Sequence, residues 1–218
     1  MIRKLAALIC LGLAPQWVLA ELPPKMTPVE VQAALLLKGN PTRGKAVFAE
    51  CAGCHRKDGS GRVSGTIPRL AGQHASVILK QLIDIRSGKR INALMAPIVE
   101  DPDLSLEAIA DAASYAESLP VAGPTGKGPG NQTERGRALY SRDCAGCHGN
   151  AGEGDATRYY PRVAAQHYGY LLRELNMIRD GARGNSNADM AAVLKPYAAA
   201  DLDALADYMS QMPAPVTR

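Results

Sequence analysis

Cys51-Ala52-Gly53-Cys54-His55 recurs 93 positions later as Cys144-Ala145-Gly146-Cys147-His148. Two cysteines separated by two residues and followed directly by histidine are typical of covalent haem attachment, because the thiols add to the vinyl groups and the histidine ligates the iron. Redox disulfides and zinc sites share the Cys-x-x-Cys part of this motif. A thioredoxin-like site needs a neighbouring βαβ pattern, and a zinc site needs further Cys or paired His ligands, and the sequence offers neither.

The sequence therefore predicts two covalently bound c-type haems. Cys51, Cys54, Cys144 and Cys147 would form the thioether links, and His55 and His148 would be the proximal iron ligands.

The two pentapeptides belong to a longer repeat. A shift of 93 positions aligns residues 51–88 with 144–181 without a gap, and 17 of the 38 aligned residues are identical. A repeat of this length indicates a duplicated domain. We place the N-terminal domain at 21–120 and the C-terminal domain at 133–218, joined by a linker at 121–132 that is rich in Gly and Pro.

Helical periodicity dominates both copies, and no stretch alternates strongly enough to predict a strand. Thr42 and Thr133 are expected to cap the first helix of each copy and Ser105 to cap a later one. The expected helices span 42–51, 76–86 and 106–118, and then 133–144, 169–179 and 201–212. Because the chain has only one Trp and one Phe, each small core needs a large cofactor. We expect an all-α fold with one haem in each domain.

The N-terminus has the pattern of a secretory signal peptide at 1–20, with Arg3 and Lys4 before an apolar stretch and cleavage expected after Ala20. Cleavage would remove Cys10 and lower the formal net charge from +4 to +2. We therefore expect a periplasmic protein that lacks an integral membrane segment, with peripheral membrane contact left open. The sequence has no basic stripe, so we expect no nucleic-acid partner.

The sixth iron ligand is expected to be a methionine in each copy. Met95 follows His55 by 40 residues, and Met190 follows His148 by 42, the difference lying in an insertion at 184–189. His74 and His167, 19 residues after each motif histidine, are the alternative ligands, although a surface or hydrogen-bonding role suits their position better.

Three further pairs of residues are candidates for supporting the haems. Pro68 and Pro161 could brace the proximal histidine through a backbone carbonyl, or simply fix a turn. The arginine pair Arg69 and Arg162, or the pair Arg86 and Arg179, could bind the haem propionates. Alternatively, these arginines remain solvated at the surface.

The mature chain resembles the dihaem cytochrome c4 family, which has two class I cytochrome c domains. The resemblance rests on CAGCH twice, on DGSG and AGEG, on PRLAGQH with NALMAPIV, and on PRVAAQH with NADMAAVL. It implies His/Met ligation at both irons, propionate edges that meet at the domain interface, and electron transfer from a quinol-oxidising complex to a terminal oxidase. The chain departs from the pattern at Ala165, which replaces the glycine found at Gly72, and in the longer Met190 loop.

We expect an electron-transfer protein that binds its redox partners transiently. Because each haem has its own methionine as a ligand, we expect no small-molecule substrate, and so the protein is not expected to be an enzyme. The alternatives are a dihaem enzyme of the peroxidase or thiosulfate dehydrogenase type, and a dedicated cytochrome subunit of a dehydrogenase. After cleavage no Cys remains outside the two motifs, which argues against an enzyme with a thiolate iron ligand.

Overall fold

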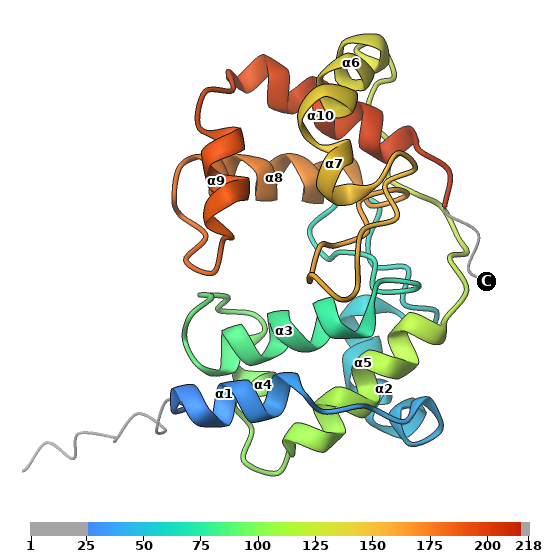
Figure 1. Ribbon diagram of the computed structural model, residues 1–218. Coiled ribbons are helices and arrows are strands. Elements are labelled where there is room, and N and C mark those ends of the chain that lie inside the picture. Colours follow the sequence, from blue (N-terminus) through green and yellow to red (C-terminus); the bar gives the residue numbers. More distant parts are fainter. Residues whose placement is uncertain (1–25, 215–218) are drawn as a thin grey trace, which may run out of the picture.

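The computed structural model describes residues 26–214, so the predicted signal peptide lies outside the described residues. Figure 1 shows two helical lobes, α1 to α5 in the lower one and α6 to α10 in the upper one. The helices are α1 (Pro28–Leu35), α2 (Pro41–His55), α3 (Ala75–Arg86), α4 (Ala96–Val99), α5 (Leu106–Ser118), α6 (Thr133–Asp143), α7 (Ala145–His148), α8 (Tyr168–Arg179), α9 (Ala188–Leu194) and α10 (Ala199–Gln211). Residues 26–214 contain no strand, which confirms the all-α expectation.

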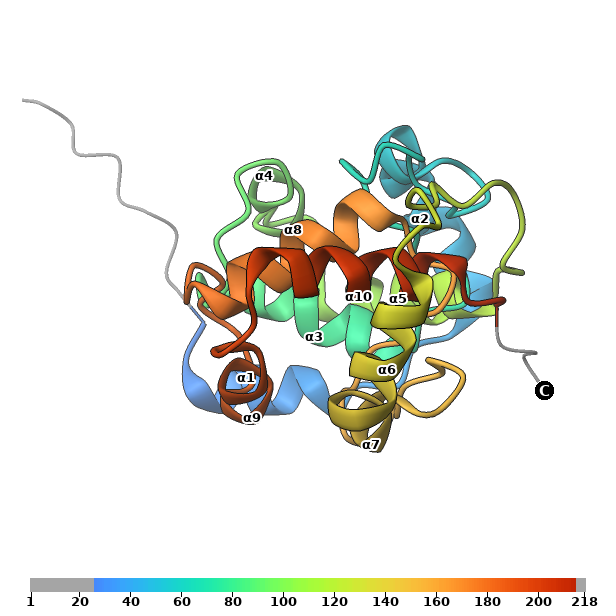
Figure 2. The same cartoon turned by 90° about the horizontal axis from the view of Figure 1, so that it is seen from above.

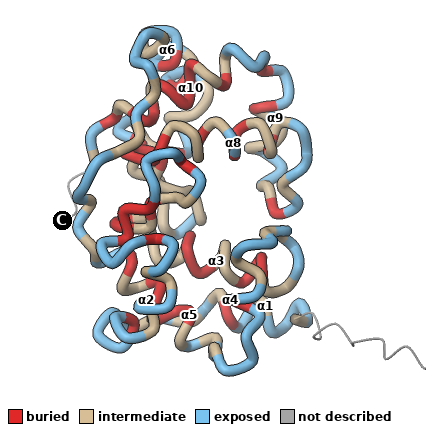
Figure 3. The backbone as a smooth tube through the Cα atoms, turned by 180° about the vertical axis from the view of Figure 1, so that it is seen from behind, coloured by how far each residue is buried: buried red, intermediate tan, exposed pale blue. Residues whose placement is uncertain are grey.

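Each lobe has a hydrophobic core of its own. The lower core includes Phe48, Ile83 and Ile109, and the upper core includes Tyr140 and Leu205. Figure 3 shows buried segments both inside each lobe and where the lobes meet. The two lobes are thus separately cored domains that share a buried contact surface.

In each domain the helix that leads into the haem motif crosses the last helix at a glycine: α2 crosses α5, and α6 crosses α10. A Cβ atom at Gly44 of α2 would lie 1.9 Å from the Asp111 carbonyl oxygen of α5, and one at Gly136 of α6 would lie 2.0 Å from that of Ala204 on α10. Beside the first crossing the ring centroids of Phe48 and Tyr115 are 5.3 Å apart, and beside the second those of Tyr140 and Tyr208 are 5.6 Å apart. Glycine is therefore required at both crossings, because no side chain fits between the backbones.

The predicted threonine caps are wrong, although Ser105 does cap α5 by accepting from the Ala108 N–H. The Asn40 side chain caps α2 instead, because it accepts from the backbone N–H groups of Thr42 and Arg43. Thr133 is already inside α6, which begins after Gln132 without a side-chain cap.

The helix that carries the haem motif is continuous in the first domain but interrupted in the second. Cys51 follows Gly44 by seven positions, whereas Cys144 follows Gly136 by eight. One extra residue would rotate the motif by about 100° around a continuous helix. Instead α6 ends at Asp143 and α7 begins at Ala145, so the break accommodates the extra residue.

The departure at Ala165 leaves the backbone conformation unchanged. Gly72 has φ +69° and Ala165 has φ +56°, so both lie in the left-handed region. This conformation costs an L-residue about 1–2 kcal/mol. The second domain keeps the turn of the first, although it lacks the glycine that makes it favourable.

Candidate haem sites and the domain interface

The motif histidines are held identically in the two domains. His55 ends α2 and His148 ends α7, and the two residues are only 5% and 7% exposed. His55 Nδ1 lies 3.0 Å from the Pro68 carbonyl oxygen, and His148 Nδ1 lies 2.9 Å from that of Pro161. Because a carbonyl oxygen only accepts, Nδ1 carries the proton and Nε2 keeps its lone pair. This is the tautomer that an iron ligand requires, and its orienting bond is the expected one.

The first cysteine of each motif, Cys51 or Cys144, is partly buried, and the second, Cys54 or Cys147, is exposed. Burial raises the pKa of Cys51, and it raises the pKa of Cys144 to about 12. A thioredoxin-like nucleophile needs a lowered thiol pKa. Within residues 26–214, no group of three or more His, Cys, Asp or Glu side chains is arranged to hold a metal ion. The geometry therefore favours thioether attachment over a redox disulfide or a zinc site.

Met95 and Met190 occupy matching local positions despite the insertion. The side-chain oxygen of Asn92 accepts from the Met95 N–H, and that of Asn187 accepts from the Met190 N–H, both at 3.2 Å. Met95 immediately precedes α4, and Met190 lies in the first turn of α9. The sequence signal for this match, an asparagine three residues before each methionine, was missed. The insertion thus ends before the segment that carries Met190.

The motifs and methionine segments of the two domains face different sides of the molecule. Figure 2 shows α2 and α4 along one side, and α7 and α9 along the opposite side. Each domain therefore combines its own motif with its own methionine segment.

Two arginines, Arg69, which is buried, and Arg162, which is half-buried, fit the acidic groups of a haem. Arg69 and Arg162 occupy equivalent repeat positions, and the Nε atom of each is buried without a hydrogen-bond partner. Burial lowers the pKa of both guanidinium groups. A second guanidinium nitrogen of each arginine donates to a carbonyl oxygen, that of Ala122 for Arg69 and that of Gly72 for Arg162. Each Nε–H is thus left to bind an anion, the partner that a desolvated arginine favours. The haem propionate carboxylates would supply it, so these residues fit the cofactor that the cysteines and histidines predict.

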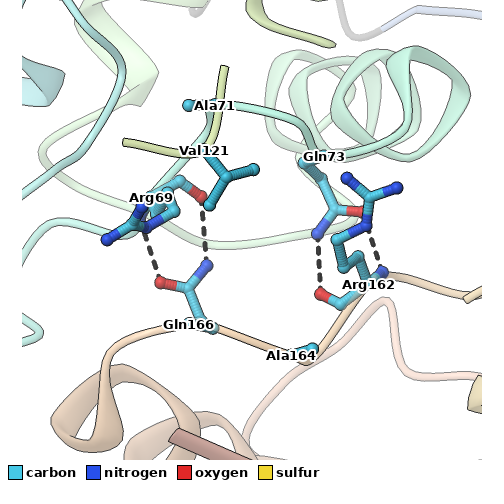
Figure 4. Close-up of a pocket in the computed structure, with 7 residues that line it drawn as sticks. All are labelled: Arg69, Ala71, Gln73, Val121, Arg162, Ala164 and Gln166. Atoms are coloured by element: carbon cyan, nitrogen blue, oxygen red, sulfur yellow. Dashed lines mark hydrogen bonds between the residues drawn. The ribbon is translucent and has the colours of Figure 1, made fainter. Parts of the chain in front are cut away.

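The same arginines take part in a reciprocal contact between the domains, shown in Figure 4. Gln166 Oε1 accepts from the Arg69 N–H and its Nε2 donates to the Arg69 carbonyl oxygen, both at 3.0 Å. Gln73 makes the matching pair of bonds with Arg162, both at 2.9 Å. The amides thus join the two domains across an approximate twofold arrangement.

The duplicated histidines also bridge the domains. His74 Nε2–H donates to the Glu153 carbonyl oxygen at 2.8 Å, and His167 Nε2–H donates to that of Ser60 at 2.7 Å. His167 is fully buried, so a surface role is wrong for it and the hydrogen-bonding role is confirmed. Its Nδ1 accepts from the Gly126 N–H at 3.0 Å, and burial lowers its pKa. Duplication of Gln-His was the only sequence signal for this contact.

Two helical domains, each with a CAGCH motif, a carbonyl-oriented histidine and an arginine with a buried Nε, define a dihaem c-type cytochrome. The sequence model of the cytochrome c family matches residues 41–120 and 133–213. The chain belongs to the cytochrome c family, as a member of its dihaem cytochrome c4 branch with two covalently bound haems c.

Relatives and a solved structure agree with this assignment. Cytochrome c4 of Pseudomonas aeruginosa is 31% identical over 181 residues, covering 78% of this chain and 88% of the relative. A thiosulfate dehydrogenase electron acceptor of Stutzerimonas stutzeri is 34% identical over 172 residues, covering 74% and 78%. The crystal structure of reduced recombinant cytochrome c4 from Pseudomonas stutzeri superposes with a TM-score of 0.72 at 28% identity, covering 80% of this chain and 100% of that one.

Proposed function

We propose that this protein carries electrons in the periplasm between a respiratory donor, such as a quinol-oxidising complex or a dehydrogenase, and a terminal oxidase or reductase. Each bound haem c supplies an Fe(III)/Fe(II) couple. The proposal rests on a set of haem-binding residues that is present once in each domain. Each set has a buried histidine whose Nε2 lone pair is free and an arginine whose Nε has no hydrogen-bond partner. Reciprocal hydrogen bonds join the two domains. Such bonds would keep two redox centres at a constant separation.

Met95 and Met190 are proposed as the sixth ligands, with His55 and His148 as the proximal ligands and the four motif cysteines as the attachment points. A thioether ligand raises the reduction potential of a haem. Arg69 and Arg162 would hold propionates, and both lie where the domains meet. Electrons could then pass between the haems at this interface.

Replacement of each methionine tests the ligands. Met95→Ala and Met190→Ala should each remove about half of the red charge-transfer absorption of the oxidised holoprotein and lower the potential of one haem. Met177→Leu, which alters a methionine with no proposed ligand role, is the matched control and should keep the full absorption. Retention of the full absorption in both alanine variants would overturn the ligand assignment.

A carrier differs from an enzyme in the reactivity of its irons. With both sixth positions occupied, the native protein should bind carbon monoxide and react with peroxide only slowly. Rapid reaction of carbon monoxide or peroxide with the native protein would point instead to a dihaem enzyme.

The similarity to a thiosulfate dehydrogenase electron acceptor favours, as a second candidate function, a dedicated cytochrome that accepts electrons from one dehydrogenase. This role uses the same chemistry with a different electron donor.

Export is proposed from the sequence at 1–20. The described residues, 26–214, include no helix with the length and apolar character needed to cross a bilayer. The expected mature protein begins at Glu21 and is recovered from the periplasmic fraction. Mass spectrometry of the purified protein checks this directly, since a mass that retains residues 1–20 would contradict the cleavage site.

A further inference from the structure

A buried polar cluster joins the loops that lead to the two methionines. One loop follows α3 and the other follows α8, and Figure 1 shows them facing each other at one end of these helices. Gly184 of the second loop lies against Lys89 of the first, where a Cβ atom would be 2.8 Å from the Lys89 carbonyl oxygen. The loops are therefore in direct contact.

Gln81 and Glu174 are the centre of this cluster. They occupy equivalent positions, 93 residues apart, on α3 and α8. Gln81 Oε1 accepts from Arg90 of the first loop at 2.9 Å and from Arg183 of the second at 2.8 Å. Glu174 Oε2 pairs with the same two arginines, at 3.1 Å and 3.0 Å. Each domain thus supplies one acceptor, and each acceptor binds both loops.

Asn185 adds a contact that belongs to the second loop. It is 7% exposed, and its Nδ2 donates to Gln81 Oε1 at 2.9 Å and to Asp84 Oδ2 at 2.8 Å. Asp84 is 2% exposed and lies on α3 of the other domain. Two residues after Asn185, Asn187 caps the helix that carries Met190. The longer loop of the second domain is therefore fastened to the N-terminal domain.

We propose that Asn185 and Asp84 are positioning residues for Met190, so that the N-terminal domain holds the sixth ligand of the C-terminal haem. This inference rests on the ligand assignment made above. Loss of either side chain frees the loop and raises the fraction of protein in which Met190 has left the iron. Met95 has no equivalent of the Asn185–Asp84 contact, because the repeat counterpart of Asp84 is Met177.

The experiment measures displacement of Met190 by imidazole in the oxidised holoprotein. A Met95→Ala background is used, so that the remaining red charge-transfer absorption reports the C-terminal haem alone. Imidazole binds only after the methionine leaves, so its apparent affinity follows the open fraction. We expect Asn185→Ala and Asp84→Ala each to raise this affinity about tenfold, since each removes buried hydrogen bonds.

Two further variants separate positioning from general damage. Asp84→Asn keeps an oxygen that can accept from Asn185 and should restore an affinity close to that of the background. Asn131→Ala alters an exposed asparagine and should change nothing. Unchanged affinity in both Asn185→Ala and Asp84→Ala overturns this inference while leaving Met190 as the ligand. Absence of the red absorption in the background protein overturns the ligand assignment itself and the inference with it.

Discussion

Replacement of Gln166 by alanine should loosen the contact between the domains by a measurable amount. Gln166 is 6% exposed and is the hydrogen-bond partner of both the N–H and the carbonyl oxygen of Arg69. Truncation leaves both groups unpaired in a buried setting. A buried polar group without a partner costs about 1–3 kcal/mol. Because water can enter part of the space, we expect a loss of about 2–4 kcal/mol in the free energy that holds the interface closed.

Amide hydrogen exchange reports this loss at the affected residue. A change of about 2–4 kcal/mol corresponds to exchange at the Arg69 N–H that is about 30-fold to 1,000-fold faster, if local opening of the interface exposes this group. Mass spectrometry of peptides that contain Arg69 in the holoprotein gives the rate. Gln73→Ala should produce the same acceleration at Arg162 because its bonds are equivalent.

Gln32→Ala, which changes an exposed glutamine on α1, is the control and should leave both rates unchanged. An Arg69 N–H that stays as protected in Gln166→Ala as in the parent protein would refute the reasoning, because the amide would then contribute nothing to closing the interface.

Two other perturbations test the fold. His167 is neutral in the folded protein because its Nδ1 accepts from Gly126, and burial lowers its pKa. Its contribution to the free energy of unfolding is therefore complete above the unfolded-state pKa of about 6.5. This contribution is lost as the pH falls through the folded-state pKa, by up to about 1.4 kcal/mol per pH unit. Denaturant unfolding at several pH values should show this slope in the parent but not in His167→Gln, and an equal slope in both would contradict it. Gly136→Ala should lower the free energy of unfolding by about 3 kcal/mol, since its Cβ would meet the Ala204 carbonyl oxygen at 2.0 Å. Ser141→Ala, at an exposed position of α6, is the comparison, and equal melting temperatures for the two variants would show that the crossing tolerates a side chain.

The sequence alone determined the features that depend on near neighbours. The spacing within CAGCH indicates the cofactor and its number, and the internal repeat predicts two equivalent domains. Helical periodicity located the long helices, although α4, α7 and α9 have only four to seven residues each, too few for a periodic pattern to emerge.

Only the tertiary structure decided what joins the domains. The contacts of Gln73, Gln166, His167 and Asn185 join residues that are 89 to 107 positions apart in the sequence. The local sequence around a glutamine or a histidine does not predict so distant a hydrogen-bond partner. The same holds for the longer loop between α8 and α9, whose polar sequence predicts a solvent-exposed loop, whereas in the structure its Asn185 is buried against α3. Hydrogen bonds of this kind depend on which backbone groups the fold buries without a partner, and that is known only once both domains are packed together.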